Sequence, residues 1–225
     1  MKKLLALLLG MMMLAAPALA ELTVVQETYL PVQMYEGSTY AYYFAEVIND
    51  GEEDAAFDEG EVAVLDAAGE EVEVIDLYDC YPFVLAPGQT GWIFGYTSLD
   101  GVSAGEVPGY KASIDDDLAD DPAPVCLPAE ATVTGTVRYD ETVYEILITV
   151  TNNTGDVFFD ALVGYALYDA EGRLLYADEA SLYGAGIPAG GTIIVRERVD
   201  GGLAETWKQQ GAEPAAARAV VFAED

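Results

Sequence analysis

The segment YALYDAEGR, residues 165–173, has a counterpart in the segment VAVLDAAGE, residues 62–70, and this pair decides the fold. Each segment leads an apolar run into an aspartate and places a glycine three residues later, which is typical of a strand that turns through a short hairpin. The two segments lie 103 residues apart, and Asn49 and Asn152 repeat at the same distance. A repeat of this length suits a β-sandwich of roughly 100 residues. The sequence therefore predicts two tandem copies of one domain.

Apolar alternation predicts the strands within each copy. In residues 144–151 one face carries Tyr144, Ile146, Ile148 and Val150, which is the pattern of a strand half-buried against a second sheet. Residues 41–47 carry the matching face in the first copy. We expect about six short antiparallel strands per copy, with a helical turn at residues 204–210. The predicted units are residues 21–114 for copy 1, residues 115–129 for an acidic linker that contains proline, and residues 130–225 for copy 2.

The second copy resembles the FxLYD family. Residues 165–169 read YALYD, with tyrosine in place of the family's phenylalanine, and the expected Asp-x-x-Gly hairpin follows. The first copy keeps the aspartate, whereas its residues 75–79, IDLYD, lack the hairpin glycine and match by coincidence. The resemblance implies an all-β fold of two tandem immunoglobulin-like antiparallel β-sandwiches. It also implies an extracytoplasmic binding or envelope-associated module, with no family catalytic residues to carry over.

Residues 1–20 read as a secretory signal peptide. Lys2 and Lys3 precede an apolar run, and Ala18-Leu19-Ala20 forms a small-x-small cleavage site. An uncleaved anchor is the alternative, although the apolar run is shorter than the ~20 residues that a spanning helix needs. We therefore expect a secreted or extracytoplasmic protein associated with the cell envelope, with no membrane insertion after signal removal.

The charge is strongly negative and unevenly distributed. The chain has 40 acidic and 9 basic residues, for a net charge of −31. Residues 21–128 hold 24 acids and one base, Lys111, whereas residues 129–225 hold 16 acids and 6 bases. Such charge opposes binding to nucleic acid or to an anionic membrane surface. It favours solubility, and it also favours a cationic protein or envelope component as partner.

Two cysteines, Cys80 and Cys126, remain in a chain predicted to reach an oxidising compartment. A single intramolecular disulfide is the leading expectation. Free thiols and an intermolecular bridge are the alternatives.

The residue content argues against most catalytic classes. The chain has no histidine, which removes Ser-His-Asp and Cys-His catalysis and nearly every catalytic zinc arrangement. No glycine-rich nucleotide motif is present. We expect a non-enzymatic binding or spacer protein without a cofactor, and the alternative is a glycan hydrolase that uses two carboxylates.

Calcium is the one metal that the composition suggests. The candidate ligands are the hard carboxylate oxygens of the predicted linker, from Asp115, Asp116, Asp117, Asp120 and Asp121. Their spacing does not fit an EF-hand, and ordinary solvated acidic loops are the simpler interpretation.

Tyr42 and Phe44 form a candidate aromatic surface. They lie on the strand face opposite Tyr43, which the alternation assigns to the core. An exposed platform for a sugar or peptide is one interpretation, and ordinary cross-strand aromatic pairs are the other.

Overall fold

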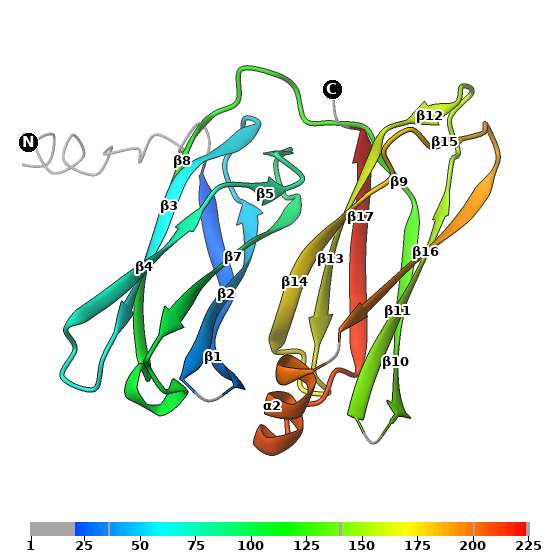
Figure 1. Cartoon of the computed structure of the whole chain (residues 1–225). Coiled ribbons are helices and arrows are strands. Elements are labelled where there is room, and N and C mark those ends of the chain that lie inside the picture. The colour runs from blue at the N-terminus through cyan, green and yellow to red at the C-terminus, as the bar shows by residue number, and fades with distance from the viewer. Residues whose placement is uncertain (1–20, 36, 140, 200, 224–225) are drawn as a thin grey trace, which may run out of the picture.

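The computed structural model describes residues 21–35, 37–139, 141–199 and 201–223. The predicted signal peptide, residues 1–20, lies outside them. The described chain is all-β, and every strand pairing in it is antiparallel. Its helical elements are one short α-helix and one 3₁₀ turn (Figure 1). None of its helices is both long and apolar enough to cross a membrane.

The first half of the chain forms two sheets around one hydrophobic core. Its elements are β1 (Leu22–Tyr35), β2 (Ser38–Asn49), β3 (Ala55–Leu65), β4 (Glu71–Leu77), β5 (Cys80–Tyr81), β6 (Val84–Leu85), β7 (Thr90–Asp100), η1 (Ala104–Glu106) and β8 (Gly109–Leu118). One sheet has the order β1-β2-β7-β5, and in the other β3 lies between β8 on one side and β4 and β6 on the other. Tyr43, Val62 and Ile75 are fully buried between the two sheets.

The second half repeats this plan. Its elements are β9 (Cys126–Leu127), β10 (Ala129–Arg138), β11 (Glu141–Thr151), β12 (Phe158–Phe159), β13 (Ala161–Tyr168), β14 (Leu174–Ser181), β15 (Gly186–Ile187), β16 (Thr192–Val199), α2 (Gly202–Gln210) and β17 (Ala216–Ala223). The sheet β10-β11-β16 faces the sheet β14-β13-β17-β9 across a core that includes Ile146, Val163 and Leu167. The helix predicted at residues 204–210 is confirmed as α2, and its Trp207 is buried against Tyr144 and Tyr176.

The repeated asparagine makes the same bonds in both halves. Each one lies at the end of a strand, is fully buried, and donates its side-chain amide to two backbone carbonyls, one in the following turn and one in the short strand β6 or β15. The bonds run from Asn49 to Glu53 (2.8 Å) and Leu85 (2.7 Å), and from Asn152 to Asp156 (2.8 Å) and Ile187 (2.7 Å). Buried polar groups need such partners, so this residue type is required at both positions.

The repeated aspartate and glycine have the same structural role in both hairpins. The side chain of Asp66 accepts two backbone N–H groups of its hairpin at 2.8 and 2.9 Å, and that of Asp169 accepts two at 3.0 and 2.9 Å. Gly69 and Gly172 have φ of 82° and 80°, a left-handed conformation that glycine adopts without strain. The hairpin predicted from the opening segments is confirmed in each half.

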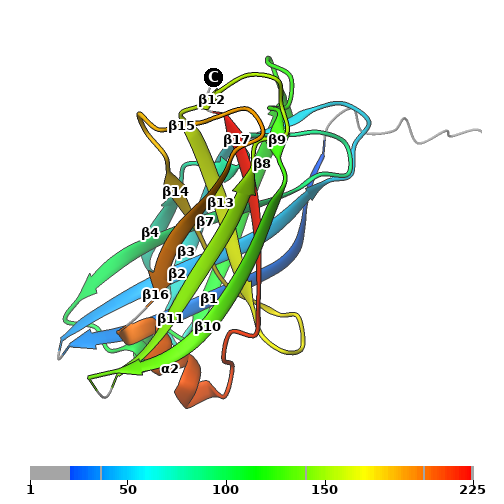
Figure 2. The same ribbon diagram turned by 90° about the vertical axis from the view of Figure 1, so that its right-hand side faces the viewer.

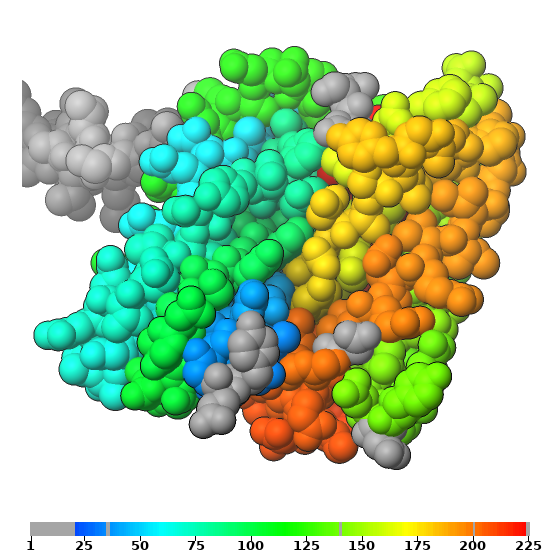
Figure 3. All heavy atoms as spheres, in the orientation of Figure 1, coloured from blue at the N-terminus to red at the C-terminus, as the bar shows by residue number. Residues whose placement is uncertain are grey.

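The two halves pack side by side as four layers of sheet. Figure 2, seen from the side of the second half, shows β10, β11 and β16 in front of β13 and β17, with the strands of the first half behind. The middle layers, β1-β2-β7-β5 and β14-β13-β17-β9, meet through a third cluster that contains Phe44, Trp92, Tyr168 and Leu174. Figure 3 shows the atoms of the two halves in contact along the molecule. Every residue of β13 is therefore buried, one face in its own core and the other against the first half.

The acidic segment predicted as a linker is partly strand. Asp115, Asp116 and Asp117 belong to β8, where they pair with β3, and Cys126 and Leu127 form β9. The connection between the halves is shorter than predicted, at residues 119–125, and crosses at the top of Figure 1. Acidic residues are tolerated in β8 because it is an edge strand, where exposed charge discourages pairing with another chain.

The predicted disulfide between Cys80 and Cys126 is wrong. Both cysteines are free. Cys80 is 1% exposed in β5, where it pairs with Ile93 of the first half. Cys126 is exposed in β9, which pairs with β17 of the second half. The two thiols thus belong to sheets of different halves, and burial raises the pKa of the Cys80 thiol.

Candidate functional site

The predicted aromatic surface is covered by the second half. Tyr42 and Phe44 do lie opposite Tyr43, as the alternation indicates. Phe44 is only 2% exposed, however, because its ring packs 5.2 Å from that of Tyr176 in β14. Tyr42 is half-buried and stacks on Phe44 with a centroid distance of 6.0 Å. Of the two interpretations, the exposed platform does not hold for Phe44, because this face forms the contact between the halves.

The predicted calcium ligands do not converge on a site. Asp115 and Asp117 are exposed on β8, Asp116 is half-buried, and Asp120 and Asp121 follow in the connection. Burial raises the pKa of Asp116, and the neighbouring charges of Asp115 and Asp117 add to this effect. Among the described residues no group of three or more acidic or cysteine side chains is arranged to hold a metal ion.

A buried aromatic pair and an ion pair hold the two halves together. Trp92 Nε1 donates a hydrogen bond of 2.9 Å to the Tyr168 hydroxyl in the buried contact. The Arg218 guanidinium lies 4.5 Å from the centroid of the Tyr168 ring and is 3.0 Å from a carboxylate oxygen of Glu46. Glu46 is 4% exposed, so this ion pair neutralises a buried charge.

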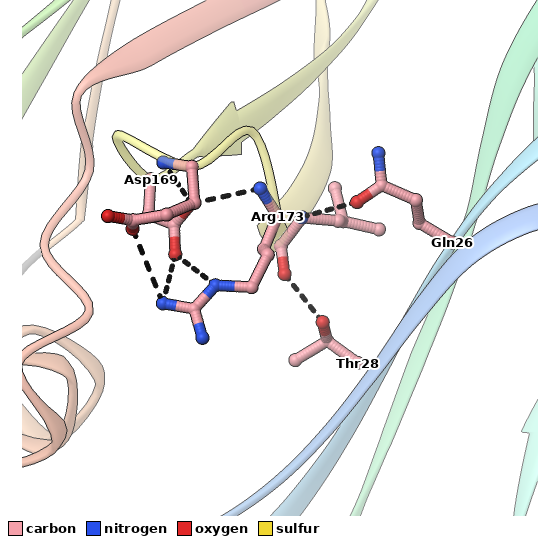
Figure 4. Close-up of polar contacts among 6 residues, drawn as sticks. Gln26, Thr28, Asp169 and Arg173 are labelled. Carbon is pink, nitrogen blue, oxygen red and sulfur yellow. Dashed lines mark hydrogen bonds and ion pairs between the residues drawn. The ribbon is translucent and has the colours of Figure 1, made fainter.

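Strand β1 is bonded to the repeat hairpin of the second half (Figure 4). The backbone N–H of Leu174 donates to Gln26 Oε1 at 3.0 Å, and the Thr28 hydroxyl donates to the Leu174 carbonyl. Next to it, Nε and Nη2 of Arg173 each lie 2.6 Å from Asp169 Oδ2. The hairpin motif that the sequence repeats therefore also positions the second half against the first.

The exposed outer face of β3, β4 and β8 is lined with carboxylates. We call it the acidic face. The pairing register sets Glu61 opposite Asp76 on β4, and Glu59 opposite Asp115 on β8. Like charges directly across a sheet destabilise it. A surface hollow of about 450 Å³ opens over these strands, and its lining residues are Asp58, Glu59, Gly60, Glu61, Asp76, Leu77, Tyr78, Ser113 and Asp115. No basic side chain lines this hollow.

Like most of the first half, the acidic face has no ion pair among the described residues, and Lys111, an exposed base on β8 opposite Ala63, is in none of them. The ion pairs of the described residues use Arg138, Arg173, Arg196, Lys208 and Arg218, all from the second half. The one first-half acid in these pairs is Glu46, at the contact between the halves. The exposed carboxylates of this face therefore remain available to a cationic partner.

An aromatic hollow of about 390 Å³ adjoins the acidic face. It lies where the end of β4 passes β7, and it shares Asp76 and Tyr78 with the first hollow. Its other lining residues are Asp79, Tyr81, Phe94, Gly95 and Tyr96. The Tyr78 hydroxyl donates to Asp76 Oδ2 at 3.0 Å.

None of the predictions made from the sequence covers this hollow. The IDLYD segment at residues 75–79 departs from the family motif. Its alternation of apolar and polar residues nevertheless indicates which side chains lie on the outer face. Ile75 and Leu77 point into the core, and Asp76 and Tyr78 are exposed on the other face. Burial raises the pKa of Asp79, which follows this strand end.

No family model matches the chain, and no curated protein matches it.

Proposed function

We propose that this protein is a secreted, non-enzymatic binding module of the cell envelope, whose acidic face captures a cationic protein or envelope component. The observation that carries the proposal is the uncompensated cross-strand pairing of Glu61 with Asp76 and of Glu59 with Asp115. A sheet that keeps like charges opposed is less stable than a neutral one, and a partner with distributed positive charge relieves that cost. Because these carboxylates do not form a metal cluster, the proposed partner is a basic surface rather than an ion.

In this proposal the scaffold is a pair of tandem immunoglobulin-like β-sandwiches similar to FxLYD modules. Two facing antiparallel sheets in each half support it, as do the repeated asparagine and the repeated Asp-x-x-Gly hairpin. The packing of the halves through Trp92 and Tyr168 gives the acidic face a fixed orientation. A rigid face loses little conformational freedom on binding.

The test is capture of a lysine-rich cationic peptide by the immobilised protein at increasing salt. We expect affinity to fall steeply with salt, because exposed charges are screened. The double variant Glu61→Gln/Asp76→Asn should weaken binding several-fold. The matched control is Glu130→Gln/Glu213→Gln, which removes two exposed carboxylates from the second half and should leave binding unchanged. Capture that is insensitive to salt and to the first variant would reject the acidic face, and absence of capture would favour a spacer role.

A glycan hydrolase that uses two carboxylates is the alternative. It is favoured by one feature: Asp76 and Asp79 line the same aromatic hollow, and burial raises the pKa of Asp79. We expect no release of reducing ends from a glycan panel between acidic and neutral pH. Release that is lost in the Asp79→Asn variant would replace the binding proposal.

A further inference from the structure

The aromatic hollow exists because Gly95 lets two strands approach closely. A Cβ atom at this position would lie 2.9 Å from Ile75 Cγ2 and 3.0 Å from the Asp76 carbonyl oxygen. Those distances are too short for any side chain, so the backbones of β4 and β7 can cross here only at glycine. The crossing places the exposed residues of β4 beside the aromatic face of β7. The hollow is thus built into the fold.

Aromatic rings form most of its wall. Tyr81 and Phe94 stack with centroids 5.3 Å apart and an interplanar angle of 16°. Tyr78 and Tyr96 are 76% and 63% exposed, so their rings are accessible to a partner. Asp76 and Asp79 add two carboxylates to the same lining.

We infer that this hollow binds the guanidinium group of an arginine side chain on the cationic partner. The inference rests on the proposed function and specifies the recognition at one end of the acidic face. A guanidinium is planar and weakly hydrated, so it stacks on an aromatic ring while it donates parallel hydrogen bonds to a carboxylate. A wall of tyrosine and phenylalanine with two aspartates provides both contacts.

Other ligands fit this chemistry less well. A lysine ammonium is compact and strongly hydrated, and it cannot stack or donate in a fork. A neutral sugar can stack on the rings, but it leaves the charges of Asp76 and Asp79 without a counter-charge. The first hollow shares Asp76 and Tyr78, so an arginine in the aromatic hollow lies beside space for a second basic residue.

The experiment compares two short peptides, one of alternating arginine and serine and one of alternating lysine and serine. Each is titrated against the protein at fixed ionic strength. We expect the arginine peptide to bind roughly three- to tenfold more tightly, because only a guanidinium adds planar stacking and a forked pair of hydrogen bonds to its charge. The Tyr96→Leu variant should lower arginine-peptide affinity to the lysine level and leave lysine-peptide affinity unchanged, because Tyr96 lines the aromatic hollow and not the first one. Tyr78 lines both hollows, so Tyr78→Leu should lower arginine-peptide affinity more than lysine-peptide affinity. Tyr183→Leu, which alters an exposed tyrosine of the second half, is the control and should change neither affinity.

The outcomes separate this inference from the function on which it rests. Equal, salt-dependent affinity for both peptides would overturn the guanidinium site and leave the acidic face as the binding surface. Failure of both peptides to bind would overturn both proposals. Displacement of the arginine peptide by a neutral oligosaccharide, with a loss in Tyr78→Leu, would identify a sugar platform and reject the inference. Circular dichroism melting of each variant confirms that the fold is retained.

Discussion

The two halves share one scaffold but differ in what covers the outer face of their equivalent sheets. In the first half this face carries Phe44 and Trp92, and the second half buries both. At the equivalent strand positions the second half has Leu147, which is half-buried, and Ile194, which is 65% exposed. Large aromatic residues therefore occur on this face where the halves touch, and they are not a feature of the repeated unit.

The halves differ equally in how they treat charge. Asp169 is 4% exposed and is paired with Arg173, whereas its counterpart Asp66 is half-buried and accepts backbone N–H groups alone among the bonds described. In the second half Glu145, Asp169 and Glu171 form ion pairs with arginines, whereas the carboxylates of the acidic face are in none of the ion pairs of the described residues. The buried carboxylate of Asp169 is paired within the protein, whereas the exposed carboxylates of the acidic face remain available to a partner.

The largest expected effect comes from Trp92. Replacing it with alanine removes a buried ring and leaves the Tyr168 hydroxyl without its donor. We expect Trp92→Ala to lower the free energy of unfolding by about 3–5 kcal/mol. Ile194→Ala changes the equivalent position in the second half and should cost less than about 0.5 kcal/mol. Urea unfolding of both variants measures the difference. Equal costs would mean that the contact between the halves contributes little to stability.

Substitutions of Asp169 and Asp66 test how much the ion pair with Arg173 stabilises the second half. Burial alone would raise the pKa of Asp169, but hydrogen bonds from the Arg173 backbone and guanidinium outweigh it and lower the pKa. A carboxyl whose folded pKa is lowered stabilises the protein above its unfolded pKa, and this contribution disappears as pH falls through the folded value. We expect Asp169→Asn to cost about 2 kcal/mol near neutral pH and much less in acid.

The matched variant Asp66→Asn should cost under about 1 kcal/mol, because Asp66 has no described ion pair and lies closer to solvent. Urea unfolding from neutral to acidic pH gives both numbers. If the two variants are equally destabilised, the Arg173 pair contributes nothing beyond the hairpin bonds that both aspartates share.

The elements inside each half could be predicted from sequence, because they depend on local patterns. Alternation at residues 144–151 located β11, and Asp66 and Asp169 located the hairpins. The contact between the halves could not be predicted, because no residue near Phe44 in the sequence indicates that Tyr176 covers it. The aromatic hollow was missed for the same reason: it depends on how Gly95 meets a strand some twenty residues earlier.

A smaller effect is expected at the acidic face. The double variant Glu61→Gln/Asp76→Asn removes one cross-strand pair of like charges, so it should raise the free energy of unfolding by about 0.5–1 kcal/mol. The control Glu130→Gln/Glu213→Gln should change it by less. A variant with a higher free energy of unfolding and a lower affinity for the cationic peptide would show that the same carboxylates destabilise the fold and bind the partner. Destabilisation would instead mean that the hydrogen bond from the Tyr78 hydroxyl to Asp76 stabilises the fold by more than the repulsion destabilises it.

The smallest effect separates the halves by their response to salt. Screening weakens repulsion between exposed charges, so added salt should stabilise the acidic face more than the compensated surface of the second half. Hydrogen exchange of the intact protein measures the free energy of local opening at each amide. We expect salt to raise it by roughly 0.5 kcal/mol more for amides of β3 and β8 than for those of β11 and β16. In Glu61→Gln/Asp76→Asn part of the difference should vanish, because one repelling pair is gone. Uniform slowing across both halves would contradict the view that repulsion is concentrated on the first.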